Sequence, residues 1–147
     1  MTTTVSRSVL GALALAGALT LATPSMAEMA NFKADLKAAS EVPPNDSKGS
    51  GSVTATYDTA SKKLSYKGSY SALTGPATAA HFHGPAEAGS NAGVQIPVSN
   101  DAIAKSPFEG EATLTDAQAS DLMAGKWYFN IHTAANKGGE IRGQVTK

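Results

Sequence analysis

The chain of 147 residues contains no cysteine, which excludes disulfide bonds, thiolate metal sites and cysteine nucleophiles. It also has no excess of positive charge, because 12 Lys and Arg stand against 12 Asp and Glu, so its charge gives no indication of nucleic-acid binding. The serine elbow typical of many hydrolases and the glycine loop that binds phosphates are both missing. These absences argue against hydrolase, kinase and dehydrogenase functions.

An apolar run lies near the amino terminus, over 9–22, with Arg7 just before it. The run is too short to span a bilayer comfortably, and a basic residue followed by a short apolar segment is typical of a secretory signal peptide. The small residues Ser25 and Ala27 lie two apart, as signal peptidase prefers, so we expect cleavage after Ala27 and loss of residues 1–27. An uncleaved membrane anchor is the alternative.

The remaining residues, 28–147, have the length of one ordinary domain and leave no room for two hydrophobic cores. Cleavage would remove Arg7 and no acidic residue, so the mature chain would carry one more acidic residue than basic residues. We expect a periplasmic or secreted protein with no membrane span after cleavage. Without disulfides, its stability has to come from core packing and from hydrogen bonds between strands.

Alternating apolar and polar residues dominate the mature chain. Over 32–38 every second residue is apolar, which predicts a half-buried strand. Two prolines then interrupt the pattern and predict a loop over 40–49. The runs 53–57 and 64–70 predict a hairpin with its turn at 58–62. Further strands are expected over 77–83, 94–98, 107–113, 126–133 and 139–146.

One segment has helical character. Thr115 and Gln118 have the spacing of a capping box and Gly125 is a suitable stop, so a short helix is expected over 115–124. Eight short strands separated by turn residues are typical of an antiparallel sandwich or barrel. We therefore predict an all-β, Greek-key-like sandwich or barrel of about eight strands with one short helix.

The chain contains three histidines. His81 and His83 are two apart in a predicted strand, so both side chains share one face, roughly 6 to 7 Å apart at Cα, and both can reach one metal ion. His132 shares the polar face of its strand with Tyr128 and Asn130. The predicted strands 77–83 and 126–133 both carry their histidines near a strand end, just before turn residues. We therefore expect the three histidines to meet at one rim of the domain.

Imidazole ligands without an acidic cluster indicate copper or zinc rather than calcium or magnesium, and an oxidising compartment favours Cu(II). The alternative is that the histidines are structural. In that case His81 and His83 would bond to backbone carbonyls of the following Gly-Pro turn, and His132 would cap its own loop.

The last predicted strand carries Glu140, Arg142 and Gln144 on one face. Glu140 and Arg142 could steer an anion toward the histidines, or could form a surface ion pair of little energetic value. Together with Tyr128 and Asn130, they are the candidates for a layer of side chains around the metal ligands.

Four motifs, taken together, resemble a known family. They are Glu41-Val42-Pro43-Pro44, Ala80-His81-Phe82-His83-Gly84-Pro85-Ala86, Asn130-Ile131-His132-Thr133 and Gly139-Glu140-Ile141-Arg142-Gly143-Gln144. In this order, over about 31–145, they are similar to the CHRD domain family, the module repeated in chordin and found singly in many exported bacterial proteins. The resemblance implies an all-β extracellular module without catalysis; in chordin the module belongs to a protein that binds growth factors.

The chain departs from the family pattern at two places. Phe82 stands where the family commonly has an aliphatic residue, and Lys137-Gly138 stands where a proline often precedes the glycine-glutamate turn. All three family histidine positions are present. The segment around Phe82 also resembles the strand that supplies two copper ligands in copper/zinc superoxide dismutases, although their bridging histidine, zinc loop and disulfide have no counterparts here.

Three functions remain as hypotheses. The first is an exported, non-enzymatic binding module, with copper or zinc held by the three histidines. The second is a copper-dependent redox enzyme of dismutase type that uses Arg142 to attract an anion. The third is a structural or adhesion module that binds an extracellular or periplasmic protein, or a polymer, through the loops 40–49 and 84–93.

Overall fold

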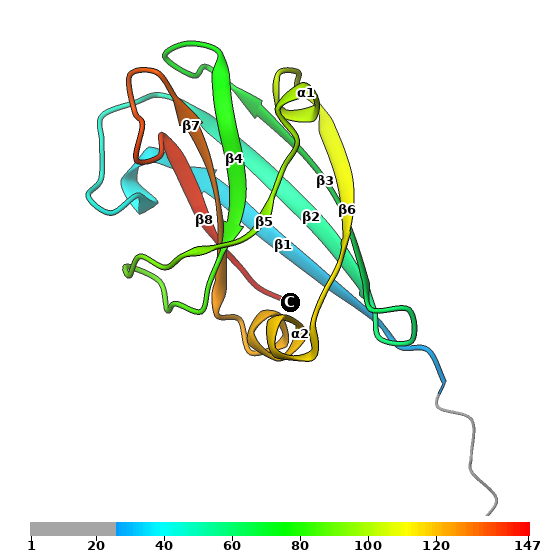
Figure 1. Cartoon of the computed structure of the whole chain (residues 1–147). Coiled ribbons are helices and arrows are strands. Elements are labelled where there is room, and N and C mark those ends of the chain that lie inside the picture. The colour runs from blue at the N-terminus through cyan, green and yellow to red at the C-terminus, as the bar shows by residue number, and fades with distance from the viewer. Residues whose placement is uncertain (1–25) are drawn as a thin grey trace, which may run out of the picture.

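The computed structural model describes residues 26–147, so nearly all of the predicted signal peptide lies outside the described residues. Eight antiparallel strands form one sheet that curls into a nearly closed barrel (Figure 1). They are β1 (Met29–Lys37), β2 (Ser50–Asp58), β3 (Lys63–Ser71), β4 (Ala77–His83), β5 (Val94–Pro97), β6 (Phe108–Thr113), β7 (Trp127–Thr133) and β8 (Ile141–Val145). Their order is β5-β4-β7-β8-β1-β2-β3-β6, so β5 and β6 are the sheet edges. The predicted fold class is confirmed.

Strand β1 shows how the alternation in the sequence becomes one buried face. Phe32, Ala34 and Leu36 are buried, and the residues between them are exposed. The strand pairs along its whole length with β2, which forms the predicted hairpin with β3. Between β1 and β2 lie a short 3-10 helix, η1 (Ala38–Ser40), and the predicted loop.

Aromatic side chains join the two halves of the sheet across the barrel interior. Phe82 on β4 contacts Tyr66 on β3 with ring centroids 5.2 Å apart, and Phe129 on β7 stacks on Phe108 on β6 at 5.8 Å. Trp127 is fully buried beside Phe82. Because burial of each large aromatic side chain contributes a few kcal/mol, these contacts hold the barrel together although β5 and β6 are not paired with each other.

The described residues also form two α-helices beside the sheet (Figure 1). Helix α2 (Asp116–Met123) begins with the predicted capping box, in which Thr115 and Gln118 bond each other's backbone N–H groups. Helix α1 (Asn100–Ile103) is a single turn capped by Ser99, and it is too short to produce a periodic sequence pattern. Within residues 26–147, no helix has the length and apolar character needed to cross a membrane.

A polar layer lies outside the barrel, over β4, β7 and β8. The loops 41–49 and 84–93 form this layer, and Asn91 joins them by donating its side-chain amide to the Val42 carbonyl at 3.2 Å. Under this cover β7 is buried on both faces, although its alternation resembles that of a half-exposed strand. Tyr128 and Asn130 on the outer face of β7 are therefore enclosed, whereas His132 on the same face is half-buried.

Candidate metal centre

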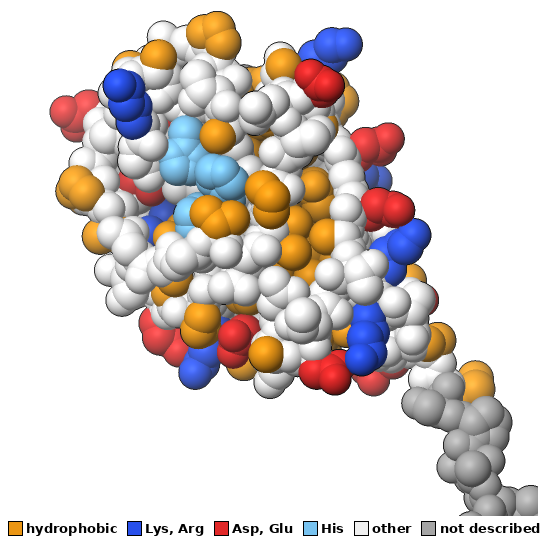
Figure 2. Space-filling model, in the orientation of Figure 1, with side chains coloured by type: hydrophobic (Ala, Val, Ile, Leu, Met, Phe, Trp, Pro, Cys, Tyr) orange, Lys and Arg blue, Asp and Glu red, His pale blue; other side chains and the backbone are white. Residues whose placement is uncertain are grey.

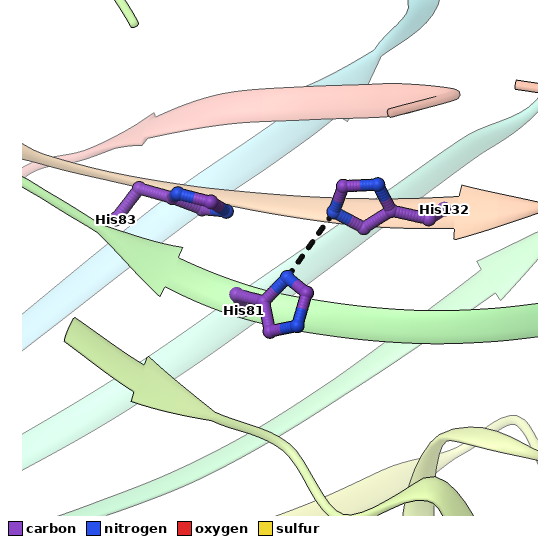
Figure 3. A group of neighbouring side chains, drawn as sticks. All are labelled: His81, His83 and His132. Carbon is purple, nitrogen blue, oxygen red and sulfur yellow. Dashed lines mark hydrogen bonds between the residues drawn. The ribbon is translucent and has the colours of Figure 1, made fainter. Parts of the chain in front are cut away.

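The three histidines converge on the outer face of β4 and β7 (Figure 2). His81 and His83 flank the core residue Phe82, and antiparallel pairing places His81 opposite Asn130, two residues before His132. One nitrogen of each imidazole points toward the space between the rings (Figure 3). One ligand atom from each ring lies within 4.8 Å of the others, and His81 Nδ1 is 3.2 Å from His132 Nε2. The predicted convergence is confirmed.

Two of the rings are anchored by backbone carbonyls. His83 Nδ1 lies 3.0 Å from the Ala92 oxygen, and His132 Nδ1 lies 2.8 Å from the Lys137 oxygen. A carbonyl oxygen only accepts, so each Nδ1 carries the hydrogen and each neutral ring presents a lone pair at Nε2. The structural alternative predicted that His132 caps its own loop, and it does, but metal-bound histidines make the same contact. His81 contacts His132 instead of a carbonyl.

Burial keeps two of the imidazoles uncharged. It lowers the pKa of His81 to about 4, and the neighbouring His132 and His83 lower it further through charge repulsion. Burial also lowers the pKa of His83, against the raising influence of the Ala92 carbonyl. Both rings are therefore neutral at pH 7, which is the form that binds metal ions.

A stack of side chains orients the buried imidazole. The rings of Tyr128 and His83 are parallel within 2°, with centroids 4.8 Å apart, and the Arg142 guanidinium carbon lies 3.4 Å from the Tyr128 centroid. Asn130 places its Oδ1 3.1 Å from His83 Nε2 and 3.0 Å from His132 Nε2. Tyr128 and Asn130 thus lie beside the histidines, as their shared strand face predicted.

Arg142 holds a loop against the sheet. Its guanidinium donates to Asn91 Oδ1 at 2.8 Å and to the Ser90 carbonyl, and the residue is only 2% exposed. With its donors directed at loop 84–93, it is not open to an approaching anion. The described residues contain no ion pair between Arg142 and Glu140, so that predicted alternative is wrong.

Glu140 belongs to a separate buried cluster. The chain turns at Gly139, whose φ is +132°, so that β8 begins after Glu140 rather than before it. The carboxylate accepts hydrogen bonds from Ser47 Oγ at 2.5 Å, Thr74 N at 2.7 Å and Thr133 Oγ1 at 2.6 Å. Burial raises its pKa, but the hydrogen bonds outweigh burial and hold the pKa at about 2. The prediction that Glu140 lies beside the histidines is therefore corrected.

Glu41 also belongs to the layer of side chains around the histidines, which its sequence pattern did not indicate. Glu41 is only 5% exposed, and its carboxyl group lies against Gly139 and the Asn130 amide. The Glu41 Oε1 atom has no hydrogen-bond partner. Burial raises the pKa of Glu41 to about 7, against the lowering influence of Arg142 and of the Asn130 amide. The acidic residue before two prolines was visible in the sequence, but that pattern does not say where its side chain points.

The spacing of the histidines fits coordination of one ion. Two imidazole nitrogens bound at 2.0–2.1 Å to a tetrahedral ion lie about 3.3 Å apart. His81 Nδ1 and His132 Nε2 are 3.2 Å apart, and His83 Nε2 faces the same space. One pair of nitrogens therefore already has the separation that a shared ion requires, and the third ring would have to move toward them, since the three ligand atoms lie within 4.8 Å of one another.

Comparison with known proteins agrees with the motifs. The CHRD domain profile matches residues 32–145, a segment that contains all three histidines, Glu41 and Arg142. No curated protein and no solved structure matches the chain. Because the family match covers most of the sequence, the resemblance carried by the four motifs is confirmed, and the chain belongs to the CHRD domain family.

Proposed function

We propose that this chain is an exported, non-enzymatic CHRD module that binds one Cu(II) or Zn(II) ion through His81, His83 and His132. The observation that carries the proposal is the convergence of three rings, two of which have their Nε2 lone pairs fixed by carbonyl contacts at Nδ1. Ligands that are already oriented lose little conformational freedom on binding, which favours affinity.

The donor set favours copper over zinc. The three ligands are all imidazoles, and the chain contains no cysteine that would select Cu(I) or a structural zinc. Nitrogen sites bind Cu(II) more tightly than Zn(II) in general. An exported protein also meets an oxidising environment, which keeps copper in the Cu(II) state. Copper is therefore the first candidate and zinc the second.

The surroundings of the site favour binding over dismutase-type catalysis. The dismutase hypothesis requires Arg142 to attract an anion toward the metal. The Arg142 guanidinium is stacked on Tyr128 and bonded to loop 84–93, so it is not free for that role. Superoxide turnover by the copper-loaded protein would point to the enzyme instead.

The test is a titration of Cu(II) and Zn(II) into the metal-free protein and three variants, His81→Ala, His83→Ala and His132→Ala. We expect one ion per chain, and a loss of affinity well over tenfold in each variant, because a removed ligand should cost more than the 10- to 100-fold typical of indirect partners. Circular dichroism of each variant checks that it remains folded.

The matched control is Glu87→Gln, which removes an exposed carboxylate from the neighbouring loop 84–93 and should bind as the wild type does. Equal, weak binding by the wild type and all variants would contradict the proposal. It would make the histidines structural and direct attention to the loops as a surface for a protein or polymer.

A further inference from the structure

The Asn130 amide lies between two imidazoles in an orientation that the neutral rings alone do not favour. Its Oδ1 is 3.0–3.1 Å from the Nε2 atoms of His83 and His132, and both of these atoms present lone pairs because their rings are protonated at Nδ1. Three acceptors facing one another repel. The contact becomes favourable if a cation lies among them, or if the amide turns by 180° and donates one N–H to each ring.

Glu41 lies on the other side of the same amide, where Asn130 Nδ2 also contacts the Gly138 carbonyl at 3.5 Å. Its carboxyl and the Asn130 Nδ2 both border the Cα of Gly139, where an added Cβ would lie 2.3 Å from Glu41 Oε1 and 2.7 Å from Asn130 Nδ2. An ionised carboxylate accepts a hydrogen bond from Nδ2, which leaves Oδ1 toward the histidines. A protonated carboxyl donates to Oδ1, which leaves Nδ2 toward the histidines.

We propose that Asn130 is a positioning residue whose amide turns with the state of the metal site, and that Glu41 is the partner that sets its direction. In the metal-free site, protonated Glu41 donates to Oδ1, and the two N–H groups of Asn130 donate to His83 and His132. In the loaded site, Glu41 is ionised and accepts from Nδ2, and Oδ1 faces the cation. This inference rests on the proposed function and assigns its regulation.

The proton balance of this exchange is simple. Loading releases the Glu41 proton to solvent, and no covalent bond other than that O–H changes. Arg142 on β8 is the charged group that lowers the pKa of Glu41, and Asn130 separates Glu41 from the histidines of β4 and β7. Since burial brings the pKa of Glu41 to about 7, the exchange takes place near neutral pH.

The first test compares the pH dependence of Zn(II) affinity in the wild type and in Glu41→Gln. Release of one Glu41 proton per ion should raise the wild-type affinity about fivefold more between pH 6 and 7 than that of Glu41→Gln, because the glutamine has no such proton to release. Glu87→Gln, which replaces an exposed carboxylate, should keep the wild-type profile. Identical profiles for the wild type and Glu41→Gln would overturn the inference.

The second test needs no metal and therefore separates this inference from the proposed function. In the 15N-labelled, metal-free protein, the Asn130 side-chain amide signals should shift with a midpoint near pH 7, and Glu41→Gln should abolish that shift. If Glu41→Gln does not fold, the wild-type titration alone decides. A pH-independent Asn130 amide would overturn the inference, whereas a wild type that shows the shift but binds no ion would overturn the proposed function and the link to loading.

Discussion

At the scale of single residues, Glu140 is a buried charge held entirely by hydroxyl, amide and backbone donors. Besides Ser47, Thr74 N and Thr133, its oxygens accept from Thr74 Oγ1 at 2.7 Å and Asn136 Nδ2 at 3.3 Å. These donors come from the loops 41–49, 72–76 and 134–140 and from the end of β7. One carboxylate therefore ties together several connections at the same end of the barrel.

Replacing this carboxylate should cost stability. Glu140→Gln removes the charge and sets an amide N–H₂ against hydroxyl donors, so the free energy of unfolding in urea should fall by about 3 kcal/mol. Glu111→Gln is the control, because Glu111 pairs with Lys63 at the surface and should change stability by less than about 1 kcal/mol. Equal, small losses of stability in Glu140→Gln and Glu111→Gln would contradict the role assigned to Glu140.

The pH dependence of the free energy of unfolding tests the same role of Glu140. Because the folded-state pKa of Glu140 is about 2, below the ordinary value of 4.5, its contribution is present above pH 4.5 and is lost as the pH falls toward 2. The Glu140→Gln variant should therefore lose less stability than the wild type over that acidic range.

At the scale of elements, the connection between β7 and β8 decides how the outer polar layer fits together. Gly138 and Gly139 are adjacent in this connection, but only Gly139 has a positive φ. A side chain at Gly139 would collide with Glu41 and Asn130, whereas one at Gly138 would meet nothing within 4 Å. The two glycines thus form a matched pair for experiment.

Gly139→Ala should destabilise the protein by about 1–3 kcal/mol through backbone strain and should displace the Glu41 and Asn130 side chains. We expect its metal affinity to fall as well, because Asn130 contacts two of the histidines. Gly138→Ala should behave like the wild type in thermal unfolding and in metal titration. A Gly139→Ala protein with wild-type stability would show that this turn tolerates a side chain.

At the scale of the whole molecule, the metal site depends on the pairing of strands that are far apart in the sequence. β4 and β7 are neighbours in the sheet, although β5, α1, β6 and α2 lie between them in the chain. This topology places His132 within reach of His81, which precedes it by 51 residues. The loops 41–49 and 84–93 meet beside this part of the sheet, where Asn91 donates to the Val42 carbonyl.

Export also concerns the whole chain. We predict that the exported protein lacks residues 1–27, because the basic residue, the apolar run and the Ser25/Ala27 pair match a cleaved signal peptide. Cleavage there would leave all eight strands complete, since β1 begins at Met29. Intact-mass measurement of protein from the periplasm or medium is the check, and molecules that retain Met1 to Ala27 would contradict the prediction.

The sequence by itself determined the strands, the capped helix and the histidine faces, because these depend on the local period of two and on the capping residues. Alternation placed Phe32 and Leu36 inside and set His132 on the polar face with Asn130. The boundary of the last strand could not be predicted, because the positive φ of Gly139 is a conformation that the sequence permits but does not require.

Only the tertiary structure decided the partners of the polar residues. Arg142 and Glu140 are two apart in sequence, yet one stacks on Tyr128 and the other binds Thr133 at the end of the barrel. Glu41 became part of the layer around the histidines because a loop folds over β7. Contacts of this kind depend on strand order and loop packing over long sequence separations, and no local periodicity carries that information.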